Sequence, residues 1–182
     1  MKRAHTLVVL VEDHPGVLNR VVSLLRRRSF NINTITVGQS EQPGVSRMTL
    51  VVVGDDDEVE QAGKQLYKLM EVLKVSDVTD VQVIAHELVM VKVATKATTR
   101  AEVLMIGQIY NARVVDASPS TLMMEITGPQ DQVDSFLTMV RPFGIRELVR
   151  TGPVAMTRGG GVVQLKDQAR DQKRGEVSIA AD

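Results

Sequence analysis

Apolar and polar positions in the first half of the chain follow the order expected of a βαββαβ unit. Apolar runs bounded by turn residues predict strands. These strands are expected at residues 6–12, 31–38, 46–53 and 73–85, the last with a break allowed near residues 76–79. The residues between the first two strands, and between the last two, have the spacing of amphipathic helices.

The first helix is predicted by an apolar stripe formed by Leu18, Val21, Val22 and Leu25. Pro15 suits its first turn, and three arginines at 26–28 suit its C-terminal end, where cations are favoured. The second helix is predicted by Val59, Ala62, Leu66 and Leu69. The acidic run at 54–58 suits its N-terminus, so these acids are expected to cap the helix rather than bind a cation.

The same order of elements occurs again in the second half. Strands are expected at residues 87–94, 112–117, 121–127 and 145–151. Two helices are predicted by the stripes Val103, Ile106, Gly107, Tyr110 and Val133, Phe136, Leu137, Val140. We therefore predict an α+β fold of two ferredoxin-like βαββαβ units, residues 1–85 and 86–158, each with both helices on one face of its sheet. The opposite face of each sheet needs cover, which predicts self-association.

Residues 159–182 have a different character. Three glycines at 159–161 precede a polar segment of mixed charge. This composition predicts a disordered tail, with a short helix expected at about residues 162–173.

Composition excludes several classes of protein. Lysine plus arginine balances aspartate plus glutamate at 22 each, and aromatic residues make up only 3%, which disfavours nucleic-acid binding. Cysteine is absent, so disulfides, thiol catalysis and cysteine–zinc sites are excluded. No apolar run reaches the roughly 18 residues that span a membrane. Glu12 and Asp13 interrupt the first apolar run, which argues against a signal peptide and favours the cytoplasm.

No catalytic constellation is visible among the polar residues. The three histidines, His5, His14 and His86, lack partners at metal-ligand spacing. Ser118 and Ser120 flank a proline without a nearby base, which is typical of a turn. We therefore expect no metal, no cofactor and no enzymatic activity on this chain alone.

The junction between the first strand and first helix is the best candidate for a ligand loop. Free amide groups at a helix N-terminus suit a carboxylate, and Gly16 allows close approach to the backbone. Asp13 can accept an ammonium group, and the amide of Asn31 can both donate and accept. These groups suit an amino-acid zwitterion, although an ordinary turn explains the same residues.

Several segments carry a family resemblance. EDHPGVLNRV (12–21) resembles the glycine-containing loop of ACT domains, which are amino-acid-sensing ferredoxin-like modules. A longer series resembles the small regulatory subunits of acetolactate synthase, over residues 3 to about 159. The matching segments are RRRSFNINTITVG (26–38), SRMTLVV (46–52), QLYKLMEVLKVSD (65–77), ELVMVKV (87–93), VDASPSTLMMEITG (115–128) and FLTMVRPFGIRELVRTGPVAMTRG (136–159).

The resemblance implies a partner and an effector. The partner is a large catalytic subunit that uses thiamine diphosphate, magnesium and FAD to make acetolactate in branched-chain amino-acid synthesis. The small subunit activates that partner and confers feedback inhibition, usually by valine, at sites where two ACT domains pair. By position, these sites fall on Asp13, His14, Pro15, Gly16, Val17, Leu18, Asn31 and Ile32. A homodimer through the ACT domains is therefore expected.

Two positions depart from the family pattern. The family usually has asparagine where this chain has Asp13, and often has glycine where it has Ser29. The first departure bears on effector identity and sensitivity. An alternative function is that of a stand-alone amino-acid-binding ACT regulator, which would act on another partner.

Overall fold

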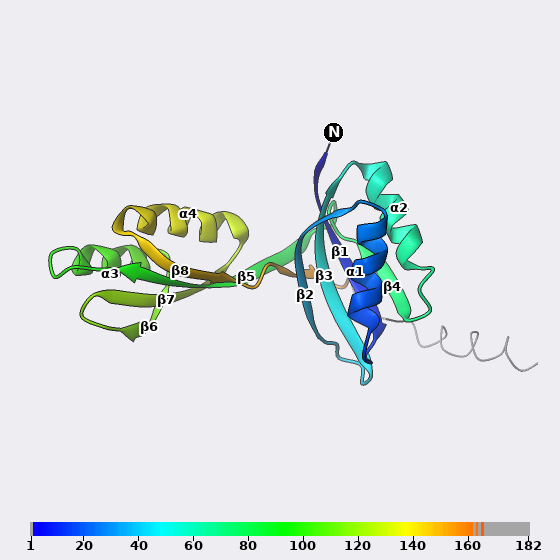
Figure 1. Ribbon diagram of the computed structural model, residues 1–182, viewed down its shortest axis with the longest axis horizontal. Coiled ribbons are helices and arrows are strands. Elements are labelled where there is room, and N and C mark those ends of the chain that lie inside the picture. The colour runs from blue at the N-terminus through cyan, green and yellow to red at the C-terminus, as the bar shows by residue number, and fades with distance from the viewer. Residues whose placement is uncertain (1, 162, 164, 166–182) are drawn as a thin grey trace, which may run out of the picture. The chain divides into compact units, whose positions relative to one another are not determined.

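The chain forms two compact units of the predicted α+β class. The computed structural model describes residues 2–161, 163 and 165. The first unit holds the residues up to Asn33, Val37–Val81 and the described residues from Gly159 on, and the second holds Thr34–Thr36 and Gln82–Arg158. Figure 1 shows the helices and strands of each unit.

The first unit has the order βαββαβ. Its elements are β1 (Arg3–Glu12), α1 (Val17–Arg27), β2 (Asn31–Gln39), β3 (Val45–Gly54), α2 (Asp56–Leu66) and β4 (Val72–Asp77). The strands lie in the order β2-β3-β1-β4, and β1 is antiparallel to both neighbours. The two helices contact each other, as Figure 1 also shows.

The second unit repeats this topology. Its elements are β5 (Val83–Ala94), α3 (Arg100–Ile109), β6 (Arg113–Ala117), β7 (Thr121–Gly128), α4 (Gln130–Val140), a 3₁₀ turn (Arg141–Phe143), β8 (Ile145–Arg150) and β9 (Val154–Thr157). The order β6-β7-β5-β8 matches that of the first sheet, so the predicted pair of ferredoxin-like units is confirmed.

Apolar stripes on the helices build the cores largely as predicted. In the second unit, the four predicted residues of α4 are all buried among strand residues such as Val91 and Met124. In the first unit, the acids at the start of α2 act as predicted: Asp55 and Glu58 form a reciprocal capping box. The acids at 55–58 therefore lie at the start of α2, and two of them cap it.

The buried stripe of α1 differs from the predicted one. The helix begins at Val17, and its buried residues are Val17, Val21 and Leu25, four residues apart, whereas Leu18 is 45% exposed. The prediction placed Pro15 in the first turn, but the left-handed residue Gly16 precedes the helix and turns the chain before it starts. Leu18 therefore faces outward beside the loop instead of the core.

Ser29 lies in the left-handed region, with φ of 61°, directly after α1. A residue with a Cβ atom is strained there by roughly 1–2 kcal/mol relative to glycine. We therefore expect Ser29→Gly to raise the free energy of unfolding by about 1 kcal/mol. Denaturant unfolding tests this, and a stability equal to or below that of the wild type would contradict it.

The prediction that one face of each sheet lacks cover is wrong for the centre of the first sheet. Five successive residues of β1, Leu7–Val11, are buried, although successive strand residues point to opposite faces. Both faces of β1 are therefore covered. In the second sheet, by contrast, Val149 of β8 and its neighbours on the face away from the helices are exposed or half-buried.

Part of the predicted tail contributes to this cover. Val163 is only 9% exposed, and its carbonyl accepts a hydrogen bond of 3.3 Å from Arg47 Nη1. Arg47 stands opposite Leu10 in the β1–β3 register, so both point to the same face. Val163 therefore packs against the first sheet, although it lies in the segment 159–182 that was predicted to be a disordered tail. The short helix expected at about residues 162–173 lies outside the described residues.

Trimming the chain after Arg158 should consequently lower the stability of the first unit. Burial of one valine side chain stabilises a fold by roughly 1.5–3 kcal/mol. Loss of this burial should lower the melting temperature by several degrees. Thermal unfolding of the trimmed and full-length chains measures the difference. Val163→Ala in the full-length chain should reproduce part of the loss, and unchanged melting of both variants would contradict this packing.

The strand β9 was not predicted. It pairs with the first part of β5, which begins at Val83 rather than at the predicted residue 87. A four-residue segment is too short for a period of two to be visible in the sequence. The predicted break in the strand over 73–85 is confirmed, because β4 ends at Asp77.

Candidate effector site

The loop between β1 and α1 is held at its β1 end by two backbone hydrogen bonds. Glu12 N donates to Glu71 O at 2.9 Å, and Asp13 N donates to Gly44 O at 2.9 Å. These bonds tie the loop to the start of β4 and to the turn between β2 and β3. The predicted loop residues from Asp13 to Leu18 therefore lie together at one end of the first sheet.

Gly16 occupies the conformation for which glycine is needed. Its φ of 92° lies in the left-handed region, and no atom lies within 4 Å of the position where a Cβ would be. Any side chain here would be strained by its backbone angles but would meet open space. The loop therefore offers the close backbone approach that the sequence predicted.

The N-terminus of α1 has no side-chain cap, and its first helical bond runs from Arg20 N to Gly16 O at 3.0 Å. Val17 N donates to His14 O at 3.5 Å, and the amides of Leu18 and Asn19 have no acceptor within the helix. They point partial positive charge toward the loop, which suits a carboxylate.

Two further loop side chains are exposed. His14 Nε2 lies 3.2 Å from Glu12 Oε2, and His14 Nδ1 lies 3.3 Å from Pro15 O. Asp13 is exposed, so its carboxylate is accessible to an ammonium group. The loop therefore offers a group complementary to each charge of an amino-acid ligand: helix amides for its carboxylate and Asp13 for its ammonium group.

Asn31 and Ile32 begin β2 and lie elsewhere. Asn31 Nδ2 donates to Asn33 Oδ1 at 3.2 Å, and Ile32 is half-buried. Asn31 lines a cavity of about 600 Å³. Its other lining residues are Lys2, Arg28, Ser29, Phe30, Val53, Asp57, Glu58 and Gln61.

One protomer does not bring the two groups of predicted site residues together. The loop precedes α1, Asn31 follows it, and an 11-residue helix is about 16 Å long. The sheet agrees: the loop follows Glu12, which pairs with Val45 at one end of β1, whereas Asn31 shares its cavity with Lys2 and Val53, near the other end, where Arg3 pairs with Gly54. A site that uses both groups therefore needs a second copy of the chain.

Glu71 is a positioning residue that the sequence did not reveal. Its side chain is buried and accepts a hydrogen bond from Arg20 Nη1 of α1, while its carbonyl accepts from Glu12 N. The residue therefore fixes the end of β1 and the start of α1 relative to each other. Arg20 and Glu71 are 51 residues apart, so no local pattern could indicate the pair.

Other kinds of site are not found in the described part of the chain. Within residues 2–161, 163 and 165, no cluster of three or more histidine, aspartate or glutamate side chains is suited to a metal ion. Among the same residues, no helix has the length and apolarity needed to cross a membrane.

Comparison with known proteins supports the assignment of both units. Residues 7–74 match the family described as the AHAS small subunit-like ACT domain, and residues 86–159 match the small subunit of acetolactate synthase. Among relatives, the probable acetolactate synthase small subunit of Methanothermobacter thermautotrophicus is 49% identical over 85% of this chain and 93% of its own length. The acetolactate synthase small subunit of Aquifex aeolicus is 44% identical over 86% of this chain and 82% of its own length.

A solved structure agrees with these matches. The crystal structure of the acetolactate synthase small subunit from Thermotoga maritima superimposes with a TM-score of 0.81 at 37% identity, covering 87% of this chain and 99% of that one. Matches of this extent include both units and the loop between β1 and α1. The chain therefore belongs to the family of acetolactate synthase small subunits.

Proposed function

We propose that this chain is the regulatory subunit of an acetolactate synthase, which activates the catalytic subunit and confers feedback inhibition by valine. The observation that carries the proposal is the loop around Gly16, which has open space, free helix amides and an exposed acid within an ACT unit of this family. The pathway served is the synthesis of isoleucine, valine and leucine. Membership of the small-subunit family is consistent with a non-catalytic role.

Valine fits the loop by its chemistry. Its carboxylate would accept from the free amides at the start of α1, and its ammonium group would lie near Asp13. Its side chain would contact Leu18 and, from a second copy, Ile32. Asn31 of that copy would add a side-chain hydrogen bond. Since the family usually has asparagine in place of Asp13, the affinity for valine is expected to differ from that of relatives.

Self-association is supported by the form of both sheets. In the first unit, β2 is an edge strand, and a site that uses both the loop and Asn31 would need a second copy. In the second unit, the face away from the helices has a hollow lined by Met90, Met123, Val149 and one ion pair. That pair, Lys92–Glu147, and a second pair, Arg113–Glu125, balance the charge of this face, which suits contact with a copy of itself.

Lysine introduced into this face should weaken the dimer. Val149 is 55% exposed on the face, and Val149→Lys would place an unpaired cation against the second copy, which should raise the dissociation constant about tenfold or more. Val154 of β9 is 53% exposed and lies on the strand that pairs with the first part of β5, away from the hollow, so Val154→Lys is a matched control. Sedimentation equilibrium of both variants measures the effect, and equal dimerisation would exclude this face.

Regulation would follow from a shift between two arrangements of the dimer. Effector bound between two ACT units favours one arrangement, and the catalytic subunit is active with the other. The cofactors of the reaction, thiamine diphosphate, magnesium and FAD, would be held by the catalytic subunit. The expected site of action is the cytoplasm.

Reconstitution tests the proposed function. The purified chain is mixed with its cognate catalytic subunit, and acetolactate formation from pyruvate is followed with and without valine. We expect the chain to raise the rate and valine to lower it again, while the chain alone gives the rate of a buffer blank. Turnover by the pure chain, or a catalytic subunit indifferent to it, would contradict the proposal and favour a stand-alone regulator.

A further inference from the structure

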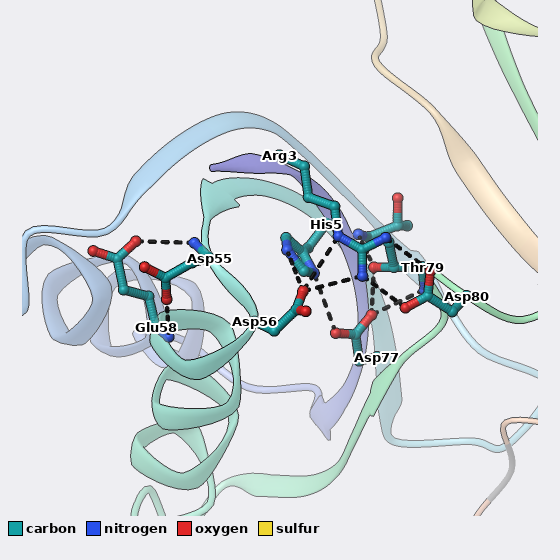
Figure 2. A network of polar contacts seen from close by, with 9 residues as sticks. Arg3, His5, Asp55, Asp56, Glu58, Asp77, Thr79 and Asp80 are labelled. Atoms are coloured by element: carbon teal, nitrogen blue, oxygen red, sulfur yellow. Dashed lines mark hydrogen bonds and ion pairs between the residues drawn. The ribbon is translucent and has the colours of Figure 1, made fainter. Parts of the chain in front are cut away.

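His5 lies in the core of the first unit in an unusual polar environment. Its ring comes from β1 and is 1% exposed, yet among the described residues neither ring nitrogen has a hydrogen-bond partner of good geometry. Instead, each nitrogen faces one carboxylate, as Figure 2 shows: Nε2 lies 3.5 Å from Asp56 Oδ1, and Nδ1 lies 3.5 Å from Asp77 Oδ2.

The two carboxylates come from different elements and are held in place. Asp56 is the first residue of α2, directly after the N-cap residue Asp55, and its Oδ1 accepts from Arg3 Nη2 at 3.0 Å. Asp77 is the last residue of β4, and its Oδ1 accepts from Thr79 N at 2.9 Å. The ring of His5 therefore lies between the start of a helix and the end of a strand.

The surroundings of the ring carry excess negative charge. The cavity that His5 lines, about 340 Å³ in volume, has four carboxylates and two cations in its walls. The charged residues are Arg3 of β1, Asp77 of β4 and Asp80 of the following turn, and Asp56, Glu60 and Lys64 of α2. The phenol of Tyr67, after α2, also lines the cavity. Arg3 donates two hydrogen bonds to Asp80 and lowers the pKa of that carboxyl, which therefore stays charged.

The protonation state of the ring decides how these contacts act. A neutral imidazole has one N–H and one lone pair, so it can donate to only one of the two carboxylates. The lone pair of its other nitrogen then faces a carboxylate oxygen with no proton between them. An imidazolium has two N–H groups and can donate to both.

We propose that His5 is a proton-operated clamp that joins α2 and β4 to β1 when its ring is doubly protonated. The clamp exists only in the folded state, where the ring lies between Asp56 and Asp77. The stability that it contributes is therefore present at low pH and is lost as pH rises. The first unit, in which the effector loop lies, is consequently expected to be more rigid in mildly acid solution.

The test is the pH dependence of thermal unfolding. His5→Gln keeps a side chain of similar size that hydrogen-bonds but does not titrate. The melting temperature of the wild type should exceed that of His5→Gln by more at pH 6 than at pH 8. This excess should be about 5 °C larger at pH 6. Asp77→Asn, a half-exposed position, should remove much of the same pH dependence. His86→Gln, an exposed histidine outside the cluster, should leave it unchanged.

Two results would overturn the clamp. One is a difference in melting temperature between the wild type and His5→Gln that is constant with pH or becomes smaller as pH falls. That result would indicate a histidine buried in its neutral form. The other is a nuclear magnetic resonance spectrum of the ring that shows a single N–H at pH 6. The spectrum needs only the wild-type chain, so the proposal stays testable if His5→Gln does not fold.

Discussion

Gly16→Asp should abolish inhibition by valine while leaving activation of the catalytic subunit largely intact. The added carboxylate would enter the open space beside Gly16, where the carboxylate of the effector is expected to lie. Two like charges about 4 Å apart near a protein surface repel by roughly 4 kcal/mol, which corresponds to about a thousandfold loss of affinity. The measurement is the valine concentration that halves the activity of the reconstituted enzyme.

Gly16→Ala separates charge from backbone strain. Alanine at φ of 92° is strained in the same way but brings no charge, and it meets no atom within 4 Å. We expect Gly16→Ala to weaken inhibition by about tenfold at most. Equal inhibition of the wild type and Gly16→Asp would show that valine is sensed elsewhere, and equal loss in both variants would show that loop geometry, not charge, governs binding.

Arg150→Met should destabilise the second unit by about 3–5 kcal/mol, the largest effect on stability that the structure predicts. Glu87 is 4% exposed and accepts two hydrogen bonds from Arg150, whose third bond goes to Asp134 at 2.7 Å. These bonds, first of all that to Glu87, raise the pKa of Arg150. Removing the cation leaves a carboxylate buried without a counter-charge. Denaturant unfolding measures the loss.

The double variant Arg150→Met with Glu87→Met is the control. Removing both charges also removes the penalty of the unpaired carboxylate, so most of the lost stability should return. A double variant as unstable as Arg150→Met would show that packing of the arginine stem, and not the buried charge, causes the effect.

The order of elements could be predicted from the sequence because each helix and strand has an apolar period of its own. The stripe of α4 is the clearest case, and the acids before α2 mark its start through a local capping box. In α1, Val21 and Leu25 are buried as predicted, but Val17 is buried in place of Leu18, and the helix starts only after Gly16, which is in a left-handed conformation. The packing of Val163 on the first sheet could not be foreseen, because it depends on a contact with Arg47, which is 116 residues away along the chain.

Only part of the candidate site could be predicted from the sequence. Loop chemistry is local, so glycine, the helix N-terminus and Asp13 could be recognised as a group. The buried partner of Arg20, Glu71, is distant in sequence and gave no signal. Asn31 and Ile32 lie at the far end of α1, so their part in the site stays a prediction that rests on a second copy of the chain.

Mixed dimers test the central claim, an effector site shared between two copies, most directly. Asn31→Ala removes a hydrogen bond to a charged ligand, worth roughly 1.5–3 kcal/mol, so each single variant alone should respond weakly to valine. In a dimer of one Gly16→Asp chain and one Asn31→Ala chain, one site carries both changes and the other carries neither. Valine binding to that mixed dimer should therefore recover one site of wild-type affinity per dimer. If no such site returns, the loop and Asn31 do not act across a dimer, and the shared site is wrong.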